Sequence, residues 1–479
     1  MLFNSLTFVA LVILTLVVYY CPPLRRYQIW ILVLASFVFY AWSAPILLLL
    51  LLASIALNVG TSYQVLHAAP RARLGWAIAG VLINLGILAT FKYAGLLTAL
   101  VFNLLGLPLP ETGDWAYRLL TLPLPVGISF YTFQGMSLVI DVLRNHRSAG
   151  ADQQIQAQFF APLTVGQYSL RTAFFLAFFP QLVAGPIVRA NDFFPQIQPK
   201  RWQEIHWPLV FQSLVTGYFL KMVIADNLKD YTFWITYPYY QGLSTSTNLV
   251  LLFGYSMQIF ADFAGYSLIA IGIAAAFGYR LPENFNFPYI SRSIAEFWRR
   301  WHISLSTWLK LYLYIPLGGN RKGPLRTYIN LIVVMTLGGL WHGAAWSYAV
   351  WGLFHGLGLA IERLLDLPRR LEGWLTEQAT GLRFLVETIQ VGAVFLFVSF
   401  GWLLFKLPRF EQALDFGATL GRNWQMGPNL VYIVPVLLLS LPVVLYHLPH
   451  FPGVAALRPF PRSPFLSQLR SRSGEFIRQ

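Results

Sequence analysis

The chain has few charged residues, and this shortage excludes most soluble architectures. Asp, Glu, Lys and Arg make up 11% of its 479 residues, whereas hydrophobic residues make up 57%. Ordinary soluble domains carry roughly 25% charged residues, so a soluble fold with less than half of that could not cover its surface. The composition predicts an integral membrane protein. Its long continuous apolar runs favour helices over a barrel, whose strands alternate in segments of about 10 residues.

Cysteine and acidic residues are scarce as well. A single cysteine, Cys21, excludes an intrachain disulfide framework and a multi-cysteine metal site. Without an H-E-x-x-H motif or a paired acidic ladder, we expect no metal. Lys and Arg outnumber Asp and Glu by 34 to 19, which gives a net charge of +15. In membrane proteins such an excess collects in cytoplasmic loops and beside anionic headgroups, so we expect a lipid bilayer and no nucleic acid as partner.

Apolar stretches long enough to cross a hydrocarbon core of about 30 Å recur along the chain. They lie near 3–21, 27–61 (a hairpin broken at Ser43–Pro45), 75–105, 119–142, 163–188, 207–225, 247–278, 328–365 (a second hairpin), 385–406 and 428–447. The predicted fold class is all-α, a polytopic transmembrane bundle of about 11 spans within one integral-membrane domain, residues 1–479. Because the first 20 residues lack a basic n-region and a cleavage site, we expect a retained first span.

The distribution of basic residues predicts the orientation in the membrane. Clusters of Arg and Lys, including those in the tail 458–478, contrast with the loops 106–117 and 234–247, which contain neither residue. The positive-inside rule then places the basic loops and the C-terminus in the cytoplasm and the N-terminus outside. Segments 163–188 and 303–317 begin and end near basic sequence, so we expect re-entrant or interfacial helices there.

One histidine, His342, lies deep in apolar sequence, where an ionisable group is costly and marks a functional hypothesis. It falls about 14 residues into the stretch that begins near residue 328, or about 20 Å along a helix. The small residues of GGLWHGAA around it let another helix or a substrate approach closely. A tight crossing with a hydrogen-bonded histidine is one explanation, and a desolvated, neutral imidazole that acts as general base is the other. His355, further along, is expected to be structural.

A second histidine, His302, lies in EFWRRWHISLSTWLKLYLYIPLGGNRKG, residues 296–323. Ser306 is at i+4 from His302, where a helix brings the two side chains close. An aromatic face at helical spacing runs along the same stretch, and an interface-lying helix accounts for it without any catalytic role. The face consists of Trp298, Trp301, Leu305, Trp308 and Tyr312.

Several polar residues nearby are weaker candidates for the site. Arg300 could meet phosphate or carboxylate groups of a donor, while its neighbour anchors the loop. Asn320 and Arg321 follow a glycine turn that resembles an anion-binding turn. Asp262, with Tyr266 at i+4, could orient a histidine or pair with an arginine, and a purely structural buried pair is equally open.

The motifs of competing chemistries are absent, including G-x-S-x-G and G-x-x-x-x-G-K-[ST]. Two intramembrane histidines remain, with hydroxyls, an amide and cations nearby. This set fits acyl transfer to a hydroxyl, in which a histidine activates the acceptor and polar donors stabilise the oxyanion. We predict His342 and His302 as catalytic residues and add Trp301 and Trp341, their sequence neighbours, to the candidates for substrate binding.

Longer blocks resemble the membrane-bound O-acyltransferase family, especially a bacterial branch that includes the alginate O-acetyltransferase membrane subunit and the D-alanyl transfer protein of teichoic acid synthesis. They are FADFAGYSLIAIGIAAAFGYRLPENFNFPYISRSIAEFWRRWHISLSTWL, LYIPLGGNR and GGLWHGAAWSYAVWGLFHG, with LPLPVGISFYTFQGMSLVIDV and FFPQLVAGPIVR upstream. The resemblance covers roughly residues 85–365, the core expected to carry the active site. One departure is Lys310 and Leu311, where relatives carry Arg-Asp.

The resemblance implies a helical bundle around a funnel or tunnel through the bacterial inner membrane. It implies His342 as the near-universal catalytic residue and His302 as the second essential one. The donor would be acetyl-coenzyme A or an acyl-carrier thioester on the cytoplasmic side, with no covalently bound cofactor. The acyl group would pass outward to a secreted polysaccharide such as alginate, or to a periplasmic acyltransferase partner that completes the transfer.

Three other functions stay open at this point. D-alanyl transfer to teichoic acid would need a carrier protein as donor. A transporter or polymer-export subunit would use intramembrane histidines for proton coupling, although no inverted repeat is evident in the sequence. A haem-binding membrane protein would use His302 and His342 as axial ligands, which a visible absorption spectrum would reveal.

Overall fold

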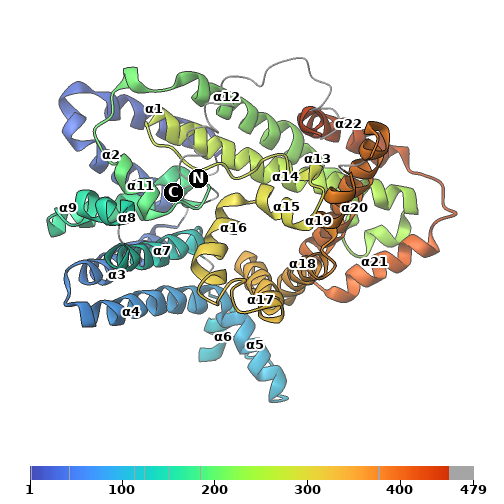
Figure 1. Cartoon of the computed structure of the whole chain (residues 1–479), viewed down its shortest axis with the longest axis horizontal. Helices are drawn as coiled ribbons and strands as arrows, with labels where there is room; N and C mark the ends of the chain where they lie inside the picture. The colour runs from blue at the N-terminus through green and yellow to red at the C-terminus, as the bar shows by residue number, and fades with distance from the viewer. Residues whose placement is uncertain are drawn as a thin grey trace.

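The computed structural model describes residues 1, 3–42, 44–112, 114–122, 125–148, 150–183, 185–375 and 378–451. Most of these residues are helical, and the β-type pairing among them is limited to an isolated bridge between Phe285 and Trp301. The all-α prediction is confirmed (Figure 1). The basic tail 458–478, used above to place the C-terminus, lies outside the described residues.

The helices follow one another along the chain with short connections. In order, the α-helices are α1 (Leu6–Tyr20), α2 (Gln28–Ala41), α3 (Pro45–His67), α4 (Pro70–Leu88), α5 (Ala94–Leu104), α6 (Trp115–Leu120), α7 (Ile128–Arg147), α8 (Ala151–Ile155), α9 (Val165–Ala177), α10 (Phe179–Leu182), α11 (Ala190–Phe193), α12 (Trp207–Tyr218), α13 (Asp226–Thr232), α14 (Thr245–Ala276), α15 (Ile294–Arg300), α16 (Ile303–Leu309), α17 (Pro324–His342), α18 (Trp346–Leu364), α19 (Leu367–Leu375), α20 (Thr380–Lys406), α21 (Phe410–Arg422) and α22 (Leu430–His447). Of the π-type segments, η2 (Ala89–Tyr93) lies between α4 and α5, η6 (Phe219–Ala225) lies between α12 and α13, and η10 (Lys310–Tyr314) follows α16.

Six described helices are long and apolar enough to cross a membrane, so the chain is a multi-pass membrane protein. They are Pro45–His67, Pro70–Leu104, Trp207–Ile235, Thr245–Ala276, Gly381–Lys406 and Leu430–His450, and the pair α1–α2, bent by 101°, would be a seventh. The predicted 11 crossings are not confirmed by this criterion. Helices α7, α17 and α18 do not meet it, since they carry buried polar groups such as Asp141, Asn330 and Glu362.

The predicted breaks in the chain are largely where the helices end. Helix α2 ends at Ala41 and α3 begins at Pro45, which confirms the first hairpin, and α17 and α18 form the second. The stretch 163–188 is broken at Phe178, between α9 and α10, as its prolines and glycine predict. The stretch 119–142 is not one helix, because α7 begins only at Ile128 and continues to Arg147.

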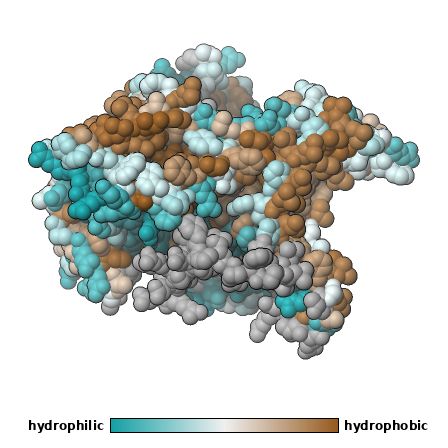
Figure 2. Space-filling view, turned by 90° about the horizontal axis from the view of Figure 1, so that it is seen from above, coloured by the Kyte–Doolittle hydropathy of each residue, from teal (hydrophilic) through white to brown (hydrophobic). Residues whose placement is uncertain are grey.

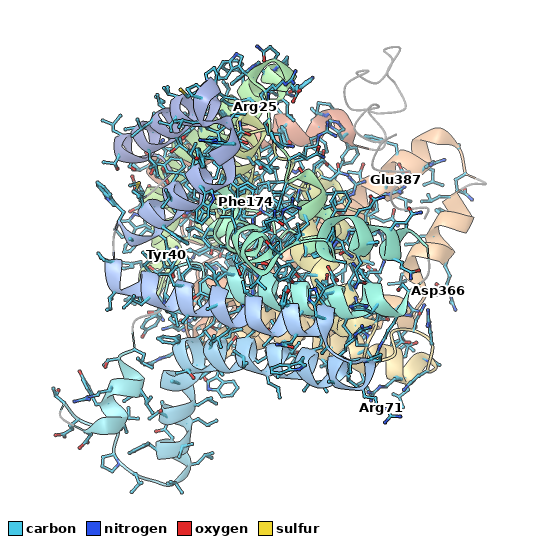
Figure 3. All side chains as sticks on the ribbon, turned by 90° about the vertical axis from the view of Figure 1, so that its left-hand side faces the viewer. Arg25, Tyr40, Arg71, Phe174, Asp366 and Glu387 are labelled. Carbon is cyan, nitrogen blue, oxygen red and sulfur yellow. The ribbon has the colours of Figure 1, made fainter. Side chains whose placement is uncertain are left out.

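Aromatic packing fills the interior between α9, α11 and the residues after α14. The ring of Phe174 lies 5.0 Å from that of Tyr279, which also stacks on Phe193 at 5.5 Å. Figure 3 shows Phe174 inside the crowded centre of the bundle. Apolar side chains also reach the surface in broad patches (Figure 2), to which α12 contributes Phe211 and Val215. A bundle that is apolar both inside and outside is what a lipid environment allows.

Helices α5 and α6 project from the body of the molecule in both side views (Figures 1 and 3). They flank the loop 106–117, which was predicted to face outside. Arg71, at the start of α4, and Asp366, which follows α18, both lie on the right-hand side of Figure 3, whereas α5 and α6 project at its lower left. The orientation of these segments in the membrane stays a prediction.

Glycines bring α17 and α18 into close contact, and this contact sets the position of the turn between them. A Cβ on Gly352 would lie 2.3 Å from the carbonyl oxygen of Met335, and one on Gly339 would lie 2.2 Å from that of Tyr348. No larger residue fits without separating the two helices.

Replacing Gly352 by alanine should therefore destabilise the hairpin by about 1–3 kcal/mol, because the methyl group overpacks a filled contact. Thermal unfolding of the purified protein in detergent measures the effect. Gly60→Ala is the matched control, since a Cβ on this helical glycine would meet nothing within 4 Å. Equal unfolding temperatures for both variants would contradict the close contact.

Candidate active site

A cavity of about 430 Å³ lies where α17, α14, α20 and the segments around α7 and α15 meet. Both predicted histidines line it, and their ring centroids are 6.2 Å apart. Most of the wall is apolar and aromatic, and few polar groups reach it. Besides the histidines, the lining includes Lys92, Ser129, Asp262, Phe263, Trp301, Trp341, Trp351, Trp402 and Phe405. An apolar pocket with a few convergent polar groups is the usual form of a small-molecule site.

His342 is the last residue of α17, at the turn of the hairpin, so it lies near a helix end and not in mid-helix as its depth in the sequence predicted. Its ring is surrounded by aromatic side chains, with centroids 5.0 Å from Trp341, 5.3 Å from Trp351 and 5.4 Å from Phe405. Gly343 follows directly in extended conformation and ends the helix. Aromatic side chains thus pack around the half-buried ring where it lines the cavity.

His302 occupies the break between α15 and α16 in a left-handed conformation, with φ 44°. This conformation is uncommon for a residue with a side chain and is found mostly where the surrounding structure enforces it. The side chain is 1% exposed, and neither ring nitrogen has a hydrogen-bond partner in the described structure. Its ring packs edge-on against Phe263 at 4.5 Å. Such a ring has both nitrogens available to a ligand in the cavity.

The strand-like segment around Asn284 holds this break in place. Ile303 donates its backbone N–H to the carbonyl of Asn284 at 3.0 Å, and the Asn284 amide oxygen accepts from the hydroxyl of Ser304 at 2.9 Å. The Ser304 hydroxyl in turn accepts from the backbone N–H of Ile187, in the broken segment after α10, at 3.0 Å. Sequence reasoning missed Asn284 and Ser304, because nothing in a single sequence pairs residues that far apart.

The predicted aromatic face of one continuous helix is wrong, since the break at His302 divides it between two short helices. Trp298 belongs to α15 and Trp308 to α16. Ser306 forms no hydrogen bond with the His302 ring, neither nitrogen of which has a partner in the described structure. Its hydroxyl donates to the carbonyl of Trp301 at 3.4 Å instead. The i, i+4 rule places two side chains on one face only when both residues lie within the same helix. His302 lies outside α16, at its N-cap and in a left-handed conformation, so the rule does not apply to it.

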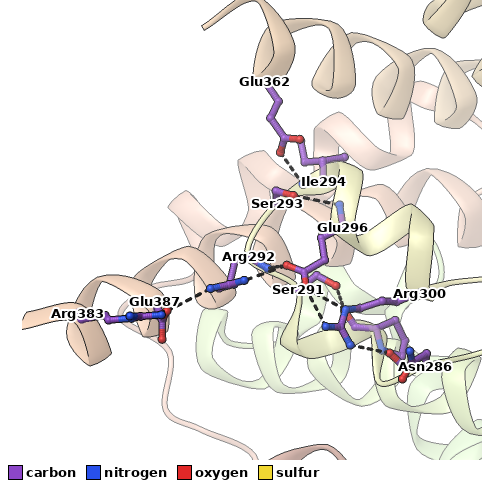
Figure 4. Close-up of polar contacts among 11 residues, drawn as sticks. Asn286, Ser291, Arg292, Ser293, Ile294, Glu296, Arg300, Glu362, Arg383 and Glu387 are labelled. Carbon is purple, nitrogen blue, oxygen red and sulfur yellow. Dashed lines mark hydrogen bonds and ion pairs between the residues drawn. The ribbon is translucent and has the colours of Figure 1, made fainter. Parts of the chain in front are cut away.

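An ion-pair network anchors α15, and none of its residues lines the cavity (Figure 4). Arg300 is 2.8 Å from Glu296 and also donates to the carbonyl of Asn286 at 3.0 Å, so its charge is engaged within the fold. Arg292 lies 3.1 Å from Glu387 of α20. Burial raises the pKa of Glu296, but the hydrogen bond from the Arg292 amide and the Arg300 guanidinium outweigh it, and the pKa lies below its ordinary value.

Glu362 connects the histidine hairpin to the His302 segment. It projects from α18, is 8% exposed, and accepts hydrogen bonds from the first backbone N–H groups of α15, those of Ile294 and Ala295 (Figure 4). A carboxylate at a helix N-terminus satisfies N–H groups that have no partner within the helix. Glu362 therefore joins the hairpin α17–α18, which carries His342, to helix α15, which precedes His302.

Asp262 lines the cavity, but it pairs with a lysine and not with a histidine or an arginine. Lys221 lies 2.6 Å from both Asp262 and Asp226, and its ammonium sits 4.9 Å from the ring centroid of Tyr266. Tyr266 therefore belongs to this ion cluster and does not line the cavity. The lysine comes from η6, a distant part of the sequence that spacing alone could not assign to Asp262.

Three further candidates, Asn320, Arg321 and His355, do not line the cavity. Asn320 and Arg321 are in an exposed turn after η10, and their role in binding stays a prediction. His355 is fully buried among aromatic rings, 5.0 Å from Trp351 and 5.4 Å from Phe397. It is not part of the cavity lining. Trp301 and Trp341, in contrast, both line it.

Comparison with known proteins agrees with this arrangement. The family model of the membrane-bound O-acyltransferases matches residues 112–381, more than half of the chain. The chain is 36% identical to the probable alginate O-acetylase AlgI of Pseudomonas aeruginosa, over 86% of this chain and 73% of that protein. It is 35% identical to the peptidoglycan O-acetyltransferase of Helicobacter pylori, over 81% and 72%, and 30% identical to the teichoic acid D-alanyltransferase of Bacillus subtilis, over 59% and 68%.

These relatives are acyltransferases, and the likeness to the first two extends over most of the chain. The matched region includes both histidine segments, the hairpin α17–α18 and most of the cavity wall. The chain therefore belongs to the membrane-bound O-acyltransferase family.

Proposed function

We propose that this acyltransferase moves an acetyl group from a cytoplasmic thioester donor to a hydroxyl of a secreted polysaccharide. His342 acts as the general base or acyl relay, and His302 holds the donor or the oxyanion. The observation that carries this proposal is the single cavity that both imidazoles share, with ring centroids 6.2 Å apart. A thioester carbonyl and an attacking hydroxyl together fit within such a spacing.

The reaction requires little beyond what the cavity contains. An imidazole nitrogen takes the proton from the acceptor hydroxyl as its oxygen attacks the thioester carbonyl, and the carbonyl electron pair moves to oxygen. When the tetrahedral intermediate collapses, the carbon–sulfur bond breaks and the thiolate leaves with the proton from the imidazolium. The aromatic wall around His342 keeps water, the competing nucleophile, away from the thioester.

Identity to relatives supports acetyl over D-alanyl transfer. The two O-acetylating relatives are 35–36% identical over more than 80% of the chain, whereas the D-alanyltransferase is 30% identical over 59%. We infer an acidic or neutral bacterial glycan such as alginate as the acceptor, with a periplasmic acyltransferase as the partner that completes the transfer. The funnel or tunnel, the inner-membrane location and an external N-terminus belong to this proposal.

The donor can be identified with purified protein in proteoliposomes. Labelled acetyl-coenzyme A should be turned over and its label transferred to an alginate oligosaccharide, while a carrier protein loaded with labelled D-alanine should give no transfer. If only the D-alanyl carrier protein is turned over, the protein is a D-alanyltransferase and not an acetyltransferase. If neither donor is turned over, the cavity is not the acyltransferase site that we propose.

A further inference from the structure

A buried lysine lies beside the two histidines, in the part of the cavity that the mechanism above does not use. Lys92 belongs to η2, the single π-type turn between α4 and α5, and its side chain is 8% exposed. Turns of this kind inside long helices are frequent at functional sites. An isolated lysine at this depth of an apolar span is costly, and this is the signal in the sequence that we did not use to predict the site.

Two side chains of η2 hold the end of α17, where His342 lies. The Lys92 ammonium donates to the backbone carbonyl of Trp341, and the Tyr93 hydroxyl donates to that of Leu340 at 2.7 Å. These are among the last carbonyls of the helix, and that of Leu340 also accepts the backbone N–H of Gly343 at 3.2 Å. Lys92 thus contacts the backbone of Trp341, the residue directly before His342.

The hydrogen-bond partners of Lys92 in the described part of the chain carry no charge. Its second hydrogen bond goes to the Ser129 hydroxyl at 2.9 Å, so both of its partners are neutral oxygens. Among the described residues no carboxylate forms an ion pair with it, in contrast to Lys221, which has two. Because an ammonium has three N–H donors, one is left for a ligand. Buried charges are ordinarily paired, so an anion is the expected ligand.

Lys92 also lines two cavities at once. The first contains both histidines, and the second, of about 450 Å³, lies against α5 and α6 and includes Ala344, two residues after His342. The ammonium therefore stands where the histidine cavity adjoins the one beside the α5–α6 projection.

We propose that Lys92 is a catalytic residue that stabilises the oxyanion of acyl transfer, an assignment that rests on the proposed function. As the acceptor oxygen bonds to the thioester carbon, negative charge develops on the carbonyl oxygen, and the free N–H of Lys92 donates to it. The charge leaves that oxygen when the carbonyl re-forms and the carbon–sulfur bond breaks. A cation placed beforehand in a dry site stabilises this charge without having to reorient.

The test compares Lys92→Met, which keeps the length of the side chain and removes its charge, with the wild type in proteoliposomes. Acetyl-coenzyme A and an alginate oligosaccharide serve as probes. Loss of one oxyanion donor lowers kcat by about 100-fold or more, with KM for the donor changed little. Lys92→Arg, which keeps the charge, should recover part of the loss. Lys406→Met is the matched control, a half-buried lysine over Tyr255 that lines neither cavity.

The outcomes separate the two proposals. If the wild type is active and Lys92→Met keeps kcat within about three-fold, Lys92 has no catalytic role. A raised KM with unchanged kcat would mean that Lys92 binds an anion in the ground state only. A lower kcat together with a lower unfolding temperature, neither of which Lys92→Arg restores, would mean that Lys92 has only a structural role. Either result overturns the oxyanion role alone. A wild type that transfers no acetyl group overturns the proposed function, and the role of Lys92 with it.

Discussion

The His342→Ala variant should lose acyl transfer by a factor of about 10³, because general acid–base catalysis by a positioned group contributes 10²–10⁴ and we propose this imidazole as the general base or acyl relay. The variant should fold and insert normally. His342 is the last residue of α17, and its ring contacts aromatic side chains at the cavity wall without filling a closed core. Initial rates with labelled acetyl-coenzyme A measure the loss.

A matched control removes a different imidazole from the same hairpin. His355 lies in α18, fully buried and away from the cavity lining, so His355→Gln should retain transfer within a few-fold even if it unfolds at a lower temperature. Equal losses in the two variants would mean that the hairpin is merely sensitive to substitution. A fully active His342→Ala protein would remove the base from the mechanism.

His302→Asn is expected to reduce transfer by about 100-fold, a typical effect of removing one stabilising donor from an active site. Asparagine is the informative substitution because it tolerates the left-handed backbone that this position adopts, whereas alanine would add strain to the loss of the ring. Thermal unfolding should stay near the wild-type value, and kinetics with varied donor concentration separate a loss of binding from a loss of turnover.

The companion variant is Ser306→Ala, which removes a hydroxyl that bonds the carbonyl of Trp301 and does not face His302. It should leave transfer nearly unchanged. Wild-type kinetics for His302→Asn would show that the second imidazole is only a packing element between Phe263 and Trp341.

The sequence was sufficient for the fold class and for the hairpins, because both follow from apolar length and from breaks at proline and glycine. Helix boundaries near Pro45 and Phe178 are local properties, and local signals predict them. The number of spans is not local. A helix enclosed by other helices, such as α7 with its buried Asp141, need not be apolar, so hydropathy alone does not place it in the membrane.

The site was predicted where the residue types themselves are unusual. Two histidines in apolar sequence indicated the cavity, and both line it. Helical spacing failed at His302, because the left-handed turn held by Asn284 interrupts the helix that the spacing assumed. Lys221 and its partner Asp262 are 41 residues apart in the sequence. Lys92 and Trp341, the residue before His342, are 249 residues apart. No spacing rule predicts contacts between residues this far apart.

One measurement tests most directly whether the two imidazoles pass an acyl group through the membrane. Labelled acetyl-coenzyme A is sealed inside proteoliposomes, and an alginate oligosaccharide that cannot cross the bilayer is placed outside. The wild type should transfer label to the external oligosaccharide, and His342→Ala should not. Label that appears outside equally with His342→Ala, or that reaches only an acceptor sealed on the donor side, would contradict transfer through the shared cavity.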